Sequence, residues 1–260
     1  MITEIQSSQN EKYKHFKALK QKKESMASGQ YTVEGFKSVM DAIDAKADIL
    51  SILVSKDFYS KNSFEFPKNC DIYIISDKLF PALSTTETPS GIIAVIKMKE
   101  KSAIALDLDK PYIYCDNIRD PGNLGTIIRT ADAAGFGGVM LSPDCVDIYN
   151  PKTVRSSMGS FFHIDINENI PYSKINDFKN QGFLLFCSLL DDETIDYTSS
   201  DMTKPLILVI GNEANGISDE MKKMADEKVK IPIVGKAESL NASIAAAILM
   251  YEVNRQRKGL

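Results

Sequence analysis

The chain has 260 residues, of which 43% are hydrophobic and 25% are charged, a composition that is typical of a globular protein and excludes a disordered or low-complexity chain. This length allows one large domain or two small ones. The net charge of -4 argues against a protein that coats nucleic acids indiscriminately, but it leaves room for a local basic patch.

The sequence begins with a lysine-rich segment. Residues 8–26 have the pattern of one polar helix, in which the acidic residues are Glu11 and Glu24. Its lysines are Lys12, Lys14, Lys17, Lys20, Lys22 and Lys23. Such a run usually forms a solvated helix face, and the alternative is a surface that contacts RNA phosphates.

Short strands and helices follow, and they predict a small α/β domain over residues 1–98. Strands are expected at residues 30–35, 49–55, 71–76 and 91–98, with a helix at 36–45 and a short element at 78–83. Residues 99–110 are rich in charged side chains, which is typical of a linker between domains.

A second series of strands and helices occupies residues 111–260. The expected strands are 112–116, 137–142, 161–166, 183–189, 205–211 and 229–234. The expected helices are 122–135, 151–160, 172–181, 218–226 and 239–257. Alternation of helices with strands that are apolar along their whole length predicts a mostly parallel sheet covered on both faces.

Three loops that follow apolar strands have an unusual composition. They contain the strings "DPGNLG" (120–125), "GNEANGISDE" (211–220) and "GKAESLNASIAAA" (235–247). Ser218 is suited to cap the helix that follows the second loop, and Ser239 or Asn241 can cap the last helix. Each loop alone fits an ordinary turn or cap. Together, at strand ends of one sheet, they favour a ligand pocket.

One arginine stands out in the helix that follows the first loop. Helical spacing places Leu124, Ile127, Ile128, Ala131 and Ala134 on one apolar face. Arg129 falls on the opposite face, and its neighbours there are all small: Gly122, Gly125, Thr126 and Ala133. This arrangement would let a ligand approach the backbone closely, although a solvated arginine gives the same pattern.

Several other chemistries are disfavoured. The chain has no GxGxxG string between a strand and a helix, and Ile217 stands where the second loop would need the lysine of a phosphate-binding loop. The two histidines are His15 and His163, so few residues could serve as the histidine of a Ser-His-Asp catalytic triad. The four cysteines are far apart, which favours buried free thiols and disfavours a metal site.

The apolar stretches of the chain are too short to span a bilayer, and its first residues have no apolar signal core. We therefore expect a cytoplasmic protein without a membrane partner.

The three loops, in this order, resemble the three motifs of the SpoU/TrmH family of RNA 2′-O-methyltransferases, which belongs to the SPOUT class. "DPGNLGTIIRTADAAGF", "LVIGNEANGIS" and "IPIVGKAESLNASIAAAILMYE" are similar to motifs one, two and three, and "VRSSMGSFFHI" to the segment after motif one. The similarity spans about residues 110–257. The amino-terminal region resembles the small RNA-binding domain of many members.

This resemblance implies a fold and a set of partners. The carboxyl-terminal domain would have a parallel sheet with its chain end threaded into a trefoil knot, an exception to the usual rule of unknotted topology. S-adenosylmethionine would bind in the knot near Gly211, Ile231 and Leu240. The protein would form a homodimer and act on RNA, with ribosomal RNA favoured over transfer RNA, and the six lysines would contact that RNA.

The resemblance also implies roles in catalysis. Arg129 would hold the target phosphate and stabilise the developing alkoxide, because a guanidinium keeps its proton and is a poor base. Asn123 and Glu213 would position Arg129 and the ribose, while Ser239 and Asn241 would shape the loop between methyl donor and substrate. The alternative is a non-catalytic RNA-binding or ribosome-assembly factor on the same fold, which would not bind the methyl donor.

Overall fold

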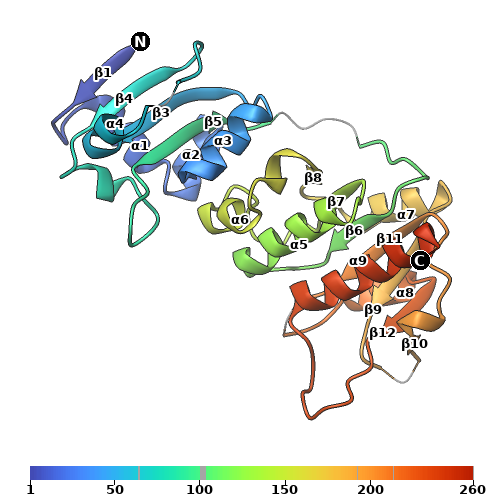
Figure 1. The fold of residues 1–260 in the computed structure, drawn as a ribbon. Helices are drawn as coiled ribbons and strands as arrows, with labels where there is room; N and C mark the ends of the chain where they lie inside the picture. Colours follow the sequence, from blue (N-terminus) through green and yellow to red (C-terminus); the bar gives the residue numbers. More distant parts are fainter. Residues whose placement is uncertain (64, 100–103, 192, 213, 260) are drawn as a thin grey trace. The chain divides into compact units, whose positions relative to one another are not determined.

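The structure of the protein, a computed structural model, describes residues 1–63, 65–99, 104–191, 193–212 and 214–259. The chain divides into two compact units, one of Met1–Glu100 with Tyr149–Phe162 and one of Lys101–Ile148 with His163–Leu260. Each unit is built around its own β-sheet (Figure 1).

The first unit contains a five-stranded mixed sheet with the strand order β1-β4-β3-β5-β2. Its strands are β1 (Ile2–Ile5), β2 (Gln30–Glu34), β3 (Ile49–Ser55), β4 (Asp71–Ile75) and β5 (Ile92–Lys97). Strand β5 runs antiparallel to both of its neighbours, and the other pairs are parallel. The helices are α1 (Glu11–Ala18), α2 (Lys22–Ser28), α3 (Phe36–Asp44), α4 (Lys56–Lys61) and the short η1 (Phe80–Ala82).

The lysine-rich segment forms two helices, so the prediction of a single helix over residues 8–26 was wrong. Asn10 caps α1, and the chain leaves the helix at Leu19, whose buried side chain joins the core below the sheet residues Leu53 and Ile75. Gln21 then adopts an extended conformation before α2 begins. The break thus lies between the buried Leu19 and the extended Gln21, and local helix propensity does not reveal it.

The second unit contains a seven-stranded sheet in the order β10-β12-β9-β11-β6-β7-β8, and every pair of strands is parallel. The strands are β6 (Tyr112–Cys115), β7 (Gly138–Leu141), β8 (Asp165–Asn167), β9 (Leu184–Ser188), β10 (Ile195–Asp196), β11 (Leu206–Ile210) and β12 (Glu227–Lys230). This confirms the predicted parallel sheet. The strand order reverses between β6 and β11, a point where open α/β sheets usually bind their ligands.

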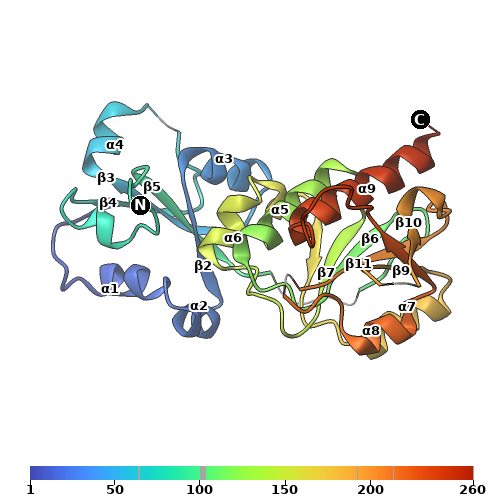
Figure 2. The ribbon, with the colours of Figure 1, turned by 90° about the horizontal axis from the view of Figure 1, so that it is seen from below.

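Helices cover both faces of this sheet (Figure 2). They are α5 (Pro121–Ala133), α7 (Tyr172–Asn180), α8 (Asp219–Met224) and α9 (Ala242–Lys258), with the short η3 (Tyr197–Ser199) at one edge. Side chains of α7 and α8, such as Phe178 and Met221, pack on one face against Tyr114, Leu185 and Val209. Helices α5 and α9 pack against each other on the opposite face.

The segment Tyr149–Phe162, which follows β7 in the sequence, packs with the first unit. It contains α6 (Pro151–Ser156) and the short η2 (Ser160–Phe162). The rings of Tyr149 and Phe161 lie 4.7 and 5.8 Å from that of Tyr31 on β2. These aromatic contacts and the approach of α6 to β2 explain why this segment belongs to the first unit.

Two strands in the second unit are shorter than the sequence predicts. Phe161 and Phe162 belong to η2, so β8 comprises Asp165–Asn167, and His163 lies in the turn before it. Strand β12 ends at Lys230, directly before Ile231 and Pro232. A proline cannot donate to the ladder and restricts the residue before it, so residues 231–241 are free to form an irregular loop. Strands β1 and β10 and helix α4 were not predicted from the sequence.

Candidate functional site

A hollow of the second unit lies where the carboxyl ends of β9, β11 and β12 meet. It has a volume of about 400 Å³, which suits a small organic ligand or cofactor. Among the side chains and backbone that line it are Leu189, Ile210, Gly211, Ile231, Ser239 and Leu240. The three residues proposed from the sequence for cofactor binding, Gly211, Ile231 and Leu240, therefore lie at one cavity.

One wall of the cavity is a short hairpin that follows β11. The backbone of Asn212 pairs with that of Gly216, with N···O distances of 3.0 and 2.9 Å. A Cβ atom on Gly211 would lie 2.2 Å from the carbonyl carbon of Gly216, so no larger residue fits there without moving the backbone. Gly211 is thus required for the close approach of the two sides of this hairpin.

Another part of the lining is the loop between β12 and α9, which includes Ser239 and Leu240. Asn241 ends this loop and caps α9, because its Oδ1 accepts hydrogen bonds from the backbone of Ser243 at 2.9 Å and of Ile244 at 3.3 Å. Asn241, and not Ser239, is therefore the cap. Ser239 is exposed at the cavity.

The amide of Asn241 joins this loop to the first motif. Its Nδ2 donates to the Oδ1 of Asn123 over 3.0 Å. Asn123 lies in the first turn of α5, and its backbone N–H donates to the carboxylate of Asp120, which caps that helix, at 2.8 Å. The structure thus brings Asn123 and Asn241, two residues predicted to be catalytic, into direct contact.

Arg129 is exposed on α5, two turns beyond Asn123. Within the described residues, its guanidinium makes no hydrogen bond or ion pair. The apolar face of the helix is buried as predicted, but Gly125, expected beside Arg129 on the open face, is buried too, in a helix that packs against α9. The open surface near Arg129 is consequently narrower than the sequence suggests. Glu213, the remaining residue predicted to be catalytic, lies outside the described residues.

The cavity also contains charged residues that were not predicted from the sequence. Asp191 follows β9, Glu238 precedes Ser239, and Lys222 lies on α8; all three line the cavity. The signal in the sequence was the position of Asp191, three residues after the apolar strand β9 ends at Ser188. Apolar lining with carboxylates and one ammonium group fits S-adenosylmethionine, which has an aromatic base, a positively charged sulfonium and an amino-acid group.

The six lysines of the first unit are all exposed, but they differ in their contacts. Lys14 pairs with Glu11 on the same helix at 2.9 Å. The Nζ of Lys20 donates to the carbonyl oxygens of Ala82 and Ser84, at 3.2 and 2.7 Å, so it has a structural role in holding that loop. Lys12, Lys17, Lys22 and Lys23 remain the members best placed to reach a ligand.

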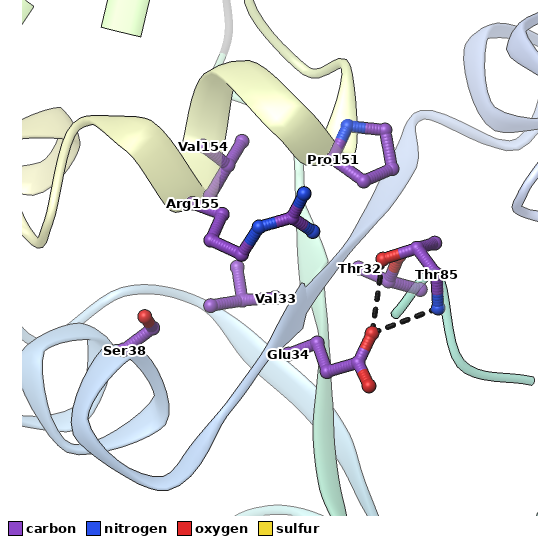
Figure 3. A pocket seen from close by; sticks show the side chains of 8 residues that line it. All are labelled: Thr32, Val33, Glu34, Ser38, Thr85, Pro151, Val154 and Arg155. Carbon is purple, nitrogen blue, oxygen red and sulfur yellow. Dashed lines mark hydrogen bonds between the residues drawn. The ribbon is translucent and has the colours of Figure 1, made fainter. Parts of the chain in front are cut away.

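A smaller hollow in the first unit lies between β2 and α6 (Figure 3). On its floor, the carboxylate of Glu34 accepts hydrogen bonds from the backbone N–H and the hydroxyl of Thr85, at 2.8 and 2.9 Å. The hydroxyls of Ser84 and Thr86 donate to the same carboxylate at 2.5 and 3.1 Å. Glu34 therefore fixes the loop before β5, and its acceptor capacity is used in doing so.

Neither a metal-binding cluster nor a membrane-spanning helix is found among the described residues. They contain no cluster of three or more His, Cys, Asp and Glu side chains that could hold a metal ion. No helix among them combines the length and the apolar composition needed to cross a bilayer.

Comparison with known proteins gives the family. Residues 110–251 match the SpoU rRNA Methylase family, and residues 10–94 match the MRM3-like substrate binding domain. The 23S rRNA (guanosine(2553)-2′-O)-methyltransferase RlmP of Bacillus subtilis is 35% identical, over 97% of this chain and 99% of its own. The tRNA (guanosine(18)-2′-O)-methyltransferase of Aquifex aeolicus is 34% identical, over 56% of this chain and 69% of its own.

The fold agrees with this match. The crystal structure of an AdoMet-bound rRNA methyltransferase from Sinorhizobium meliloti superposes with a TM-score of 0.88, at 30% identity and with 98% of each chain covered. Both the family match and the superposition include the cavity and the three motif loops described above. The chain therefore belongs to the SpoU rRNA methylase family and is an S-adenosylmethionine-dependent RNA 2′-O-methyltransferase.

Proposed function

We propose that the protein transfers a methyl group from S-adenosylmethionine to a ribose 2′-hydroxyl of ribosomal RNA, and specifically of the large-subunit RNA. The observation that carries this proposal is the cavity of about 400 Å³ bounded by the loops of motifs two and three. Ribosomal RNA is favoured over transfer RNA by the length of the alignments with the two relatives. The 23S rRNA enzyme aligns along 97% of the chain, whereas the tRNA enzyme aligns along 56%.

S-adenosylmethionine supplies an electrophilic methyl group on a sulfonium. Backbone groups at Gly211, Ile231 and Leu240 would hold it, and the half-buried Ile231 offers an apolar surface for its base. The carboxylates of Asp191 and Glu238 would stabilise the positive charge of its sulfonium by electrostatic attraction. The chain end around this site would form the trefoil knot that is typical of the SPOUT class.

The residues of the three motifs would prepare the acceptor. A ribose hydroxyl is a poor nucleophile, so its orientation and the stabilisation of negative charge on its oxygen determine the rate. Arg129 would bind the phosphate of the target nucleotide and stabilise the developing alkoxide, while a phosphate oxygen or water accepts the proton. A guanidinium with no ion pair within the described residues is free to do so.

Positioning would fall to the polar side chains around the cavity. Asn123 and Glu213 would orient Arg129 and the ribose, and Ser239 and Asn241 would shape the loop that separates donor and acceptor. The hydrogen bond of 3.0 Å between Asn241 and Asn123 supports this role, because it connects the donor loop to the helix that carries Arg129.

The protein would have one domain for RNA binding and one for catalysis. Residues 1–98 would bind the RNA, residues 99–110 would link the domains and residues 111–260 would carry the methyltransferase activity. The lysines of α1 and α2 would contact phosphates. Ile244 and Tyr251 are 50% and 53% exposed, one above the other on α9, and such an apolar stripe suits a homodimer contact. Four free cysteines fit a cytoplasmic location.

The test is the transfer of a labelled methyl group from S-adenosylmethionine to RNA purified from a strain that lacks this gene. Separate assays with 23S rRNA, 16S rRNA and transfer RNA, followed by nucleoside analysis, identify the acceptor. We expect label in a 2′-O-methyl nucleoside of 23S rRNA, and none in RNA from the parent strain, whose site is already methylated. Label confined to transfer RNA, or to a base, would refute the proposal.

A further inference from the structure

We infer that Asp116 is a positioning residue that sets the shape of the methyl-donor cavity, an inference that rests on the proposed function. Asp116 is the residue that follows β6, next to the point where the strand order of the sheet reverses. Its side chain is fully buried and makes no ion pair within the described residues. A buried carboxylate of this kind persists only where hydrogen bonds stabilise it.

Those hydrogen bonds come from the loop that forms one wall of the cavity. The backbone N–H of Ser218, the residue that ends this loop and caps α8, donates to Oδ2 of Asp116 at 2.7 Å. The backbone N–H of Asp116 in turn donates to the carbonyl of Ile210, where the loop begins, at 2.8 Å. Both ends of the 211–217 loop are therefore fixed on one residue.

A neighbouring contact fixes the loop at a third point. The Nδ2 of Asn212 donates to the carbonyl oxygen of Asn117 at 2.9 Å. Asn117 has a φ of +60°, a conformation that asparagine tolerates better than most residues, and its Nδ2 donates to Oδ1 of Asp116 at 3.2 Å. The Asp116–Asn117 pair thus connects the end of β6 to the loop of the second motif.

A second donor to Oδ1 of Asp116 comes from a residue outside the three motifs. The hydroxyl of Tyr172, at the start of α7, donates to Oδ1 of Asp116 at 2.8 Å. With Asn117 and Ser218, this makes three donors to a charged acceptor, and charge-assisted bonds are the stronger class. Asp116 itself does not line the cavity; it acts through the residues that do, Gly211, Asn212 and Ile217.

The decisive variant is Asp116→Asn, tested by calorimetric titration with S-adenosylmethionine and, separately, with S-adenosylhomocysteine. The amide of the variant presents a donor where either the N–H of Ser218 or the Nδ2 of Asn117 needs an acceptor, so the loop loses an anchor. We expect the dissociation constant for both ligands to rise about 10- to 100-fold, the effect of removing one charge-assisted hydrogen bond. In kinetic assays the KM for S-adenosylmethionine should rise by a similar factor, more than kcat falls.

Tyr114→Phe is the matched control. Tyr114 lies on β6, the strand that Asp116 follows. Its ring is fully buried and its hydroxyl donates to the carbonyl of Ile170 at 2.9 Å, so the substitution removes a buried hydrogen bond and leaves the bonds of Asp116 in place. It should lower the melting temperature but leave the dissociation constant unchanged. An Asp116→Asn protein that binds with wild-type affinity, or a Tyr114→Phe protein that binds as weakly as Asp116→Asn, would overturn the inference.

If Asp116→Asn does not fold, a second pair of variants tests the same bond from its other end. Ser218 has a φ of −62°, which proline also adopts, so Ser218→Pro deletes the N–H that donates to Asp116. Ser218→Ala removes the capping hydroxyl alone and is its control. We expect weakened donor binding in Ser218→Pro but not in Ser218→Ala, and equal affinities would overturn the inference. Failure of the wild-type protein to bind the donor at all would instead refute the proposed function.

Discussion

Asn241 donates a hydrogen bond from its Nδ2 to the Oδ1 of Asn123 over 3.0 Å, although the two residues are 118 positions apart in the chain. The Oδ1 of the same Asn241 side chain accepts from the first turn of α9. One asparagine therefore caps the last helix with its oxygen and holds the first motif with its nitrogen. The two functions can be separated by mutation.

Asn241→Asp should separate them. A carboxylate retains the acceptor that caps α9, and aspartate is as good a cap as asparagine, so the melting temperature should change little. The donor to Asn123 is lost, and two oxygen atoms would face each other. We expect methyl transfer to fall about tenfold, the effect of one hydrogen bond of roughly 1.4 kcal/mol. Asn241→Ala should lose stability as well, and equal melting temperatures for the two variants would contradict this division.

Arg129→Ala should abolish most methyl transfer without affecting the fold. Arg129 is exposed and makes no hydrogen bond or ion pair within the described residues, so its removal should change the free energy of unfolding by about 0.5 kcal/mol or less. Loss of the group that stabilises the alkoxide should lower kcat about 10²- to 10³-fold. The dissociation constant for S-adenosylmethionine is the control and should stay at its wild-type value. Near-normal transfer by this variant would remove Arg129 from the proposed mechanism.

Gly211→Ala should close the donor cavity. Its Cβ would lie 2.2 Å from the carbonyl carbon and 2.5 Å from the carbonyl oxygen of Gly216, which are backbone atoms that move only with the whole hairpin. We expect S-adenosylmethionine binding, measured by calorimetry, to weaken at least tenfold. Gly235→Ala is a matched control, because a Cβ there meets no atom within 4 Å. Equal affinities for the two variants would show that the hairpin adjusts freely.

The sequence predicted the long strands and the loops of the site, but not the features that depend on contacts between distant segments. Long apolar strands such as β9 and β11 were predicted, because burial on both faces leaves a clear pattern. The two-residue strand β10 and the break between α1 and α2 were not, since they depend on tertiary contacts. The loops that line the cavity were found from their composition, but the Asn123–Asn241 bond joins distant segments that no local pattern connects. Arg257 similarly reaches from α9 to the carbonyl of Asp109, at 3.0 Å.

The lysines of the first unit should divide into two groups. Glutamine at Lys12, Lys17, Lys22 and Lys23 should weaken binding to the RNA substrate and flatten its dependence on salt, by roughly 0.7 to 0.9 in logarithmic slope for each phosphate that the protein no longer neutralises. Lys20→Gln should instead lower the melting temperature, because its Nζ holds the carbonyls of Ala82 and Ser84. An unchanged salt slope in the fourfold variant would mean that these lysines are only solvated.

Glu252 should make the protein sensitive to acid. Its carboxylate is buried on α9, and hydrogen bonds from Arg255 lower its pKa from the ordinary value of 4.5, with Gln256 contributing in the same direction. The Nε and Nη2 atoms of Arg255 donate to its two oxygens at 2.9 and 2.8 Å. A carboxyl group with a lowered pKa stabilises the folded state fully above the pKa of the unfolded chain, and this contribution disappears as the pH falls through the folded value.

The comparison of wild type with Glu252→Gln isolates this contribution from that of other carboxylates. The difference in melting temperature between the two proteins should be constant near neutral pH and should shrink once the pH falls below 4.5. Thermal unfolding followed by circular dichroism from pH 7 to about pH 3 measures this difference in melting temperature. The range is chosen because ordinary carboxyl groups titrate within it. A difference that stays constant over this range would show that the Glu252–Arg255 pair is not what makes the fold acid-sensitive.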